Sequence, residues 1–168
     1  MLPEHTKIMV LMHGAGEVIG RKKLQKMVYI GKKLNLPFQE KYTFHMYGPY
    51  SEELTLRVEE LCGFGFVTEV KEKKAGYYQY RYEVTEKGQE FLDAFPNEWL
   101  DHRASGVIEH LNGHSSRFLE LVSTVLYFED LPEAQMKEKV FALKKSQNYS
   151  EEDMQEALDF INSLKNLQ

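Results

Sequence analysis

Apolar side chains recur at helical spacing near the start of the chain. Residues 4–13 and 20–35 each carry apolar residues three and four positions apart, which predicts two helices. Gly14 and Gly16 end the first helix, and Pro37 cannot continue the second. The second helix is amphipathic, and its outer arc is predicted to be basic. The cations on this arc are Arg21, Lys22, Lys26, Lys32 and Lys33.

A short strand and a third helix are predicted in the middle of the chain. Residues 41–46 alternate between polar and apolar and lead into a turn at 47–50. Ser51 is suited to cap a helix that runs to about Cys62, because its hydroxyl can accept a hydrogen bond from the first turn. The buried stripe of this helix is predicted to be Leu54, Val58 and Leu61.

A hairpin is predicted next, with strands at 66–71 and 77–84 around a polar turn. Side chains alternate between the two faces of a strand, so the tyrosines of the second strand divide into two groups. We expect one group to pack on the core with Val84, and Tyr77 to face a partner from the other side. The core-facing group is Tyr78, Tyr80 and Tyr82. Thr85 is placed to cap a short fourth helix.

The rest of the chain has a helical pattern throughout. Pro96 and Asn97 interrupt this pattern, so we place a boundary there, between a domain at 1–95 and a helical extension at 96–168. The extension is predicted to hold helices at 99–111, 116–131, 132–145 and 151–167. The helix at 116–131 has an unusually broad apolar surface. Together with the last helix, it is predicted to form a homodimer interface.

The order of elements predicts an α+β, mainly helical fold. Helix, helix, short strand, helix and hairpin follow one another as in a winged-helix domain, where the hairpin is called the wing. The later helices would form a C-terminal extension. With 168 residues, 42% of them hydrophobic, the chain can supply one ordinary core.

The composition limits the expected cellular location and the expected classes of binding partner. A single cysteine excludes an intramolecular disulfide and a cysteine-based zinc site, which favours a reducing, cytoplasmic location. No apolar run approaches the ~20 residues that span a bilayer, so we expect no membrane association. The net charge of -5 gives no general attraction to nucleic acid. Only residues 1–40 have a basic excess, with seven Lys and Arg against three Glu.

Several motifs resemble those of known bacterial proteins. The segments at 24–29 (LQKMVY) and 47–51 (YGPYS), followed by an acidic helix, are similar to the uncharacterised YwgA-like proteins over residues 5–165. More distantly they resemble the SocA-like (Panacea) antitoxin and adaptor domains. The segment at 82–92 resembles the wing exit of bacterial winged-helix regulators. SocA-like domains act through protein partners, so this resemblance implies protein interaction and supplies no catalytic residue.

The third helix occupies the place of a DNA-reading helix, but its outward side chains are mainly acidic. They are Glu52, Glu53, Leu56, Glu59 and Glu60, and Arg57 is the single cation. Duplex DNA carries one negative charge per ~1.7 Å of its axis, so these carboxylates disfavour reading of the major groove. We therefore expect a regulator or protein-interaction module. The residues expected to contact a protein partner are Leu56, Arg57, Glu59, Glu60 and Tyr77.

An alternative is a DNA-binding transcriptional regulator that contacts phosphates away from the third helix. The basic second helix and the hairpin offer cations for such contacts. These residues are Arg21, Lys22, Lys26, Lys33, Lys71, Lys73, Lys74 and Arg81. A solvated face of amphipathic elements explains the same residues without any ligand.

The sequence offers little support for catalysis. The best metal-binding trio is His102, His110 and His114, but Asn112 and Gly113 interrupt the helix that would align the last two. We therefore expect no catalytic residue, no metal and no cofactor, and a protein that is not an enzyme.

Overall fold

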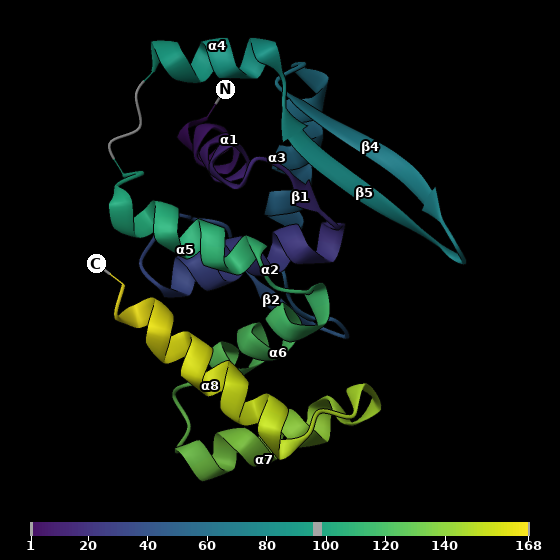
Figure 1. Cartoon of the computed structure of the whole chain (residues 1–168), viewed down its shortest axis with the longest axis vertical. Coiled ribbons are helices and arrows are strands. Elements are labelled where there is room, and N and C mark those ends of the chain that lie inside the picture. The colour runs from purple at the N-terminus through teal and green to yellow at the C-terminus, as the bar shows by residue number, and fades with distance from the viewer. Residues whose placement is uncertain (1, 96–98, 168) are drawn as a thin grey trace.

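The computed structural model describes residues 2–95 and 99–167, which form an α+β structure of helices and two small antiparallel sheets (Figure 1). The elements of the first half are α1 (Pro3–Ala15), β1 (Val18–Ile19), α2 (Arg21–Lys33), β2 (Thr43–His45), β3 (Gly48–Tyr50), α3 (Glu52–Gly63), β4 (Val67–Lys74), β5 (Tyr77–Val84) and α4 (Glu86–Ala94). Those of the second half are α5 (His102–Asn112), α6 (Ser116–Tyr127), α7 (Glu133–Leu143), the 3-10 helix η1 (Lys145–Gln147) and α8 (Glu151–Lys165).

The larger sheet has the strand order β1-β5-β4, and both pairs are antiparallel. Strand β1 is only two residues long, and the hydrophobic pattern did not predict it. It pairs Val18 with Tyr82, which joins the start of the chain to the β4–β5 hairpin. This hairpin extends away from the helices, with its turn at the far end (Figure 1). Gly76 takes a positive φ of 80° in this turn, a conformation that glycine adopts without strain.

Three predicted helix starts are confirmed by their caps, whereas the helix predicted from residue 99 begins at His102. The Ser51 hydroxyl accepts a hydrogen bond from the Leu54 amide at 3.1 Å, and Thr85 does the same for Gly88 at 3.0 Å. Ser150 and Asp153 form a reciprocal capping box at the start of α8. These contacts satisfy backbone N–H groups that have no partner inside the helix.

One hydrophobic core runs through both parts of the chain. It includes Leu54 and Val58 from α3 as well as Leu119 and Val125 from α6. Helix α2 packs against α5 and α6, which ties the predicted N-terminal domain to the helices that follow it. The predicted boundary at Pro96 and Asn97 lies outside the described residues.

The broad apolar surface of the helix predicted at 116–131 is buried within the chain. Residues 119–126 of α6 are all buried, because this helix packs against α2, α7, α8 and β3. In α8, the apolar stripe that includes Met154 and Leu164 is also buried. The breadth of the apolar surface therefore reflects internal packing, and it no longer supports the predicted homodimer interface on the helices at 116–131 and 151–167.

The expected packing of Tyr78 on the core is wrong. Its side chain is 56% exposed, because it lies towards the end of the hairpin, beyond the reach of the helices. The Lys71 ammonium lies 4.4 Å from the centre of its ring. Tyr82 is buried and Tyr80 packs partly against the core, as expected. Tyr77 is exposed, as predicted.

Candidate binding pocket and its surroundings

A pocket of about 330 Å³ lies where α2, α3, the β2–β3 hairpin and the larger sheet meet. Part of its lining is apolar and comes from Leu24, Leu54 and Val58. The remainder is polar, aromatic or charged. These residues are Arg21, Lys22, Gln25, Lys26, Tyr47, Tyr50, Thr55, Glu59, Glu69 and Tyr82. Both its volume and its mixed lining are typical of small-ligand sites.

Buried hydrogen bonds fix two walls of the pocket relative to each other. The Gln25 side chain on α2 donates to the Ser51 carbonyl oxygen at 2.9 Å and accepts from the Ser51 amide at 2.9 Å. It also donates to the Thr55 hydroxyl at 3.1 Å, and the Tyr50 hydroxyl lies 2.9 Å from the same oxygen. Helix α2 is therefore held to the start of α3 by a satisfied polar network.

A second network lies on the wall that the sheet provides. Arg21 donates to one carboxylate oxygen of Glu69 at 3.1 Å, and the Tyr82 hydroxyl donates to the other at 2.6 Å. The Arg21 guanidinium also lies 3.6 Å from the centre of the Tyr80 ring. Burial and the bond to Glu69 raise the pKa of Tyr82 above its ordinary value, so this hydroxyl stays protonated.

The predicted outward position of Lys26 is wrong. Its side chain is 1% exposed, because the β2–β3 hairpin covers this part of α2, and its ammonium donates to the Pro49 carbonyl oxygen at 3.0 Å. Burial lowers the pKa of Lys26 to about 8; Glu120 opposes this shift and Lys144 adds to it. Lys144 donates to the Met46 carbonyl oxygen at 2.8 Å and lies 3.8 Å from the Glu120 carboxylate. We call Lys26, Glu120 and Lys144 the buried charge cluster.

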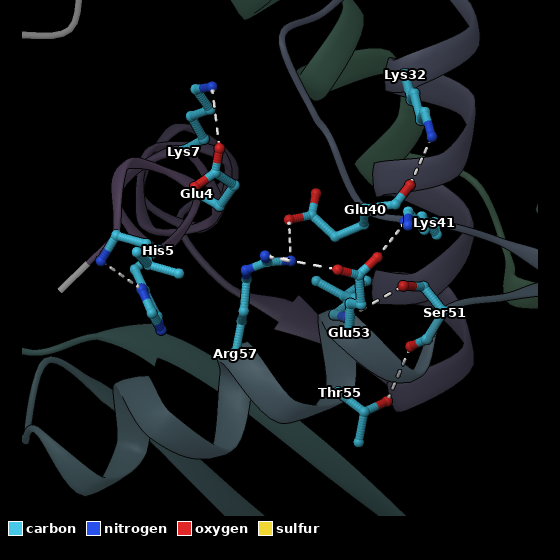
Figure 2. Close-up of polar contacts among 12 residues, drawn as sticks. Glu4, His5, Lys7, Lys32, Glu40, Lys41, Ser51, Glu53, Thr55 and Arg57 are labelled. Atoms are coloured by element: carbon cyan, nitrogen blue, oxygen red, sulfur yellow. Dashed lines mark hydrogen bonds and ion pairs between the residues drawn. The ribbon is translucent and has the colours of Figure 1, made fainter.

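Arg57, which is predicted to face outward, has a side chain that is only 15% exposed. Figure 2 shows its guanidinium between the carboxylates of Glu40 and Glu53, at 3.0 and 3.8 Å. The Glu40 side chain is 1% exposed, and burial raises its pKa while Arg57 opposes the shift. Glu53 in turn accepts a hydrogen bond from the Lys41 amide at 2.7 Å. The ion pair between Arg57 and the buried Glu40 therefore anchors the segment before β2 to α3.

The remaining outward residues of α3 are placed as predicted. Leu56 is 57% exposed. Glu52, Glu59 and Glu60 are exposed beside it, and Glu60 lies 3.3 Å from the buried His5 ring nitrogen. We call Glu52, Leu56, Glu59 and Glu60 the outer face of α3. It combines one large apolar side chain with three carboxylates.

The predicted basic residues do not form one patch. Arg21 stacks on Tyr80, and the strand register places Lys71 and Lys73 on the same face of the β4–β5 hairpin as that tyrosine. Lys74 alternates to the opposite face. Lys22 is exposed on the first turn of α2, 3.5 Å from the centre of the Tyr47 ring.

Two other predicted cations are engaged by carboxylates. Lys33 lies at the far end of α2, 3.9 Å from Glu129. Arg81 contacts Glu72 at 3.0 Å and Glu17 at 3.4 Å. The structure therefore brings together Arg21, Lys71 and Lys73, and separates Lys26, Lys33 and Arg81 from them.

His114 and Cys62 lie in ordinary packing environments. His114 stacks on Phe118 and meets the edge of Phe160, and burial lowers its pKa. Burial raises the pKa of Cys62, which keeps the thiol protonated. Within residues 2–95 and 99–167, no three His, Cys, Asp or Glu side chains are grouped so as to hold a metal ion.

Sequence reasoning missed the polar lining of the pocket, namely Tyr47, Tyr50, Glu69 and the role of Gln25. The motif at 47–51 was the available signal, because it places two tyrosines around a glycine-proline turn.

None of the helices in the described parts of the chain combines the length and the apolar character that a membrane span requires.

These features define an α+β protein whose helices and β4–β5 hairpin enclose a pocket lined by tyrosines and charges of both signs. The chain is 57% identical over 167 residues to a protein of Bacillus subtilis (strain 168) named "Uncharacterized protein YwgA", and the match covers 99% of each chain. The chain therefore belongs to the YwgA family. No protein-family profile matches it.

Proposed function

We propose that the protein is a non-enzymatic winged-helix interaction module that binds a partner protein through the outer face of α3. The winged-helix assignment is supported by the order α1, β1, α2, α3 and the β4–β5 hairpin, with β1 completing a three-stranded sheet. The β2–β3 hairpin is then an insertion between the second and third helices. The distant resemblance to SocA-like adaptor and antitoxin domains agrees with a role in protein binding.

The exposure of Leu56 is the observation that carries this proposal. A 57% exposed leucine lies among three exposed carboxylates on the helix that would otherwise read DNA. Apolar side chains at the centre of an interface supply much of its binding energy, and charges around them select the partner. The partner is therefore a protein with a small apolar depression surrounded by Lys and Arg.

Site-specific photo-crosslinking in cells, followed by affinity measurements, tests the proposal. A photoreactive residue at Leu56 is expected to capture a partner that the same residue at Leu143 does not, although Leu143 is also an exposed leucine. With the captured protein purified, Leu56→Asp is expected to weaken binding at least tenfold, and Leu143→Asp to leave it unchanged. Equal affinity of the Leu56→Asp variant and the wild type, with both folded by circular dichroism, would refute the proposal.

A second candidate is a DNA-binding regulator that contacts phosphates through the hairpin and the start of α2. The observation in its favour is the shared position of Arg21, Lys71 and Lys73 on one face of the hairpin. If this candidate is correct, the protein binds duplex DNA in a salt-dependent manner. The double change Lys71→Glu and Lys73→Glu then weakens that binding. The double change Lys145→Glu and Lys165→Glu is the matched control, because both lysines are exposed on η1 and α8. If both changes weaken DNA binding equally, the binding reflects general electrostatic attraction and this candidate site does not exist.

A further inference from the structure

The pocket between α2 and α3 has one feature that does not involve the exposed Leu56 side chain. Most of its charged lining residues already have partners within the chain: Arg21 with Glu69, and Lys26 with Pro49. Lys22 and Glu59 are different. Over the described residues, neither of their charged groups makes an ion pair or a hydrogen bond.

These two residues lie on different walls of the pocket. Lys22 belongs to the first turn of α2, where its ammonium lies 3.5 Å from the centre of the Tyr47 ring, and Glu59 belongs to α3. The apolar residues Leu24, Leu54 and Val58 belong to the same two helices and line the same cavity. A ligand that matches this lining has an anionic group, a cationic group and an apolar body.

The length of the ligand follows from the separate positions of the two charges. In a single amino acid both charged groups are attached to one carbon atom, whereas Lys22 and Glu59 belong to two different helices that line the cavity. Two or three extended residues span about 7–10 Å and keep their charges at opposite ends. A volume of about 330 Å³ is at the lower end for small-ligand sites, which excludes a long peptide.

We propose that this pocket binds a short free peptide of two or three residues with apolar side chains, whose carboxylate pairs with Lys22 and whose ammonium pairs with Glu59. The apolar side chains pack on Leu24, Leu54 and Val58. Glu59 also belongs to the outer face of α3, so the two proposed sites share this residue, whereas Leu56 does not line the pocket. The Leu56→Asp variant therefore tests partner binding without changing the pocket lining.

Calorimetric titration of the full chain tests the proposal with defined probes. The probes are leucyl-leucine, leucyl-phenylalanine and trileucine, each also in C-amidated and N-acetylated form, with leucine as the length control. At least one unmodified peptide is expected to bind saturably. Each blocked form is expected to bind about tenfold more weakly, because it loses one charge-assisted contact, and leucine is expected not to bind.

Two variants assign the ends of the peptide to residues. In the Lys22→Gln variant, amidation of the peptide is expected not to weaken binding further. In the Glu59→Gln variant, acetylation of the peptide is expected not to weaken binding further. Lys145→Gln and Glu156→Gln are matched controls at exposed positions and should behave as the wild type. The proposal is wrong if no unmodified peptide binds saturably at millimolar concentration. It is equally wrong if blocked peptides bind as tightly as unmodified ones.

Discussion

The Lys26 ammonium donates a hydrogen bond to the Pro49 carbonyl oxygen at 3.0 Å, and it does so from a side chain that is almost fully buried. Lys144 makes the corresponding contact to Met46 on the same β2–β3 hairpin. Two lysines from distant parts of the chain therefore hold one wall of the pocket, with Glu120 as the buried carboxylate beside them.

Loss of the Glu120 charge is predicted to destabilise the fold more than loss of the Lys26 charge. Glu120→Gln leaves two buried ammonium groups without a carboxylate and should cost about 3 kcal/mol of unfolding free energy. Lys26→Met should cost at most about 1 kcal/mol, because the loss of the bond to Pro49 is offset by the removal of a buried charge. Urea denaturation measures both, and a larger loss for Lys26→Met would contradict the role given to Glu120.

The unfolding free energy is predicted to rise between about pH 8 and about pH 10. In this window Lys26, with a folded pKa of about 8, has lost its proton, whereas the unfolded chain, with an ordinary value of 10.5, retains it. The unfolded state then binds more protons, so a higher pH favours the folded state. Denaturation at a series of pH values measures this rise, which the Lys26→Met variant should largely lack.

Above about pH 10 the unfolding free energy is predicted to fall. Burial raises the pKa of Tyr29, Tyr82 and Tyr149, so the folded chain keeps phenolic protons that the unfolded chain releases. Ultraviolet absorbance at high pH follows the ionisation of these tyrosines. Their release of protons at the ordinary tyrosine pKa while the chain is still folded would contradict this prediction.

Arg57 is predicted to act in stability, because it neutralises the buried carboxylate of Glu40. Arg57→Met should lower the unfolding free energy by about 3 kcal/mol. The double change Glu40→Gln and Arg57→Met should cost less than Arg57→Met alone, since no buried charge then remains. Chemical denaturation of both variants measures the difference, and a loss below about 1 kcal/mol for Arg57→Met would show that the pair is not important to the fold.

The substitution of Gly88 in α4 by alanine is predicted to destabilise the protein, although alanine normally favours a helix. A Cβ atom at this position would collide with the Phe66 carbonyl oxygen and lie 2.8 Å from Val84 Cγ1. Gly88→Ala should therefore cost about 2 kcal/mol. In Gly106→Ala on α5 the new atom meets only Leu167 at 3.7 Å, so this change should gain about 0.5 kcal/mol. Equal changes in melting temperature for the two variants would contradict this account.

Local signals predicted much of the fold. The caps at Ser51, Thr85 and Ser150 depend on side chains within three residues of the helix start, so the sequence alone reveals them. Strand β1 was missed because two residues are too few to show a period of two. Strand β3 was predicted as a turn because Pro49 and Gly48 are typical of turns.

The candidate site was harder to predict because it depends on contacts between distant segments. The arc of α2 that holds Lys26 is polar in sequence, and only the packing of the β2–β3 hairpin shows that it is buried. The pair of Arg57 with Glu40 joins residues seventeen positions apart, which no local pattern indicates. In contrast, the exposure of Glu52, Leu56, Glu59 and Glu60 was predicted correctly, because helical spacing places these residues on the outer side of α3.

We propose that the carboxylates on the outer face of α3 disfavour binding to duplex DNA and favour binding to a protein. Fluorescence anisotropy of a labelled duplex, titrated with the full chain at low ionic strength, tests it most directly, because low salt strengthens any contact with phosphates. The account predicts no saturable binding. Tight binding that weakens steeply with salt and is lost in the Lys71→Glu and Lys73→Glu double variant would contradict it.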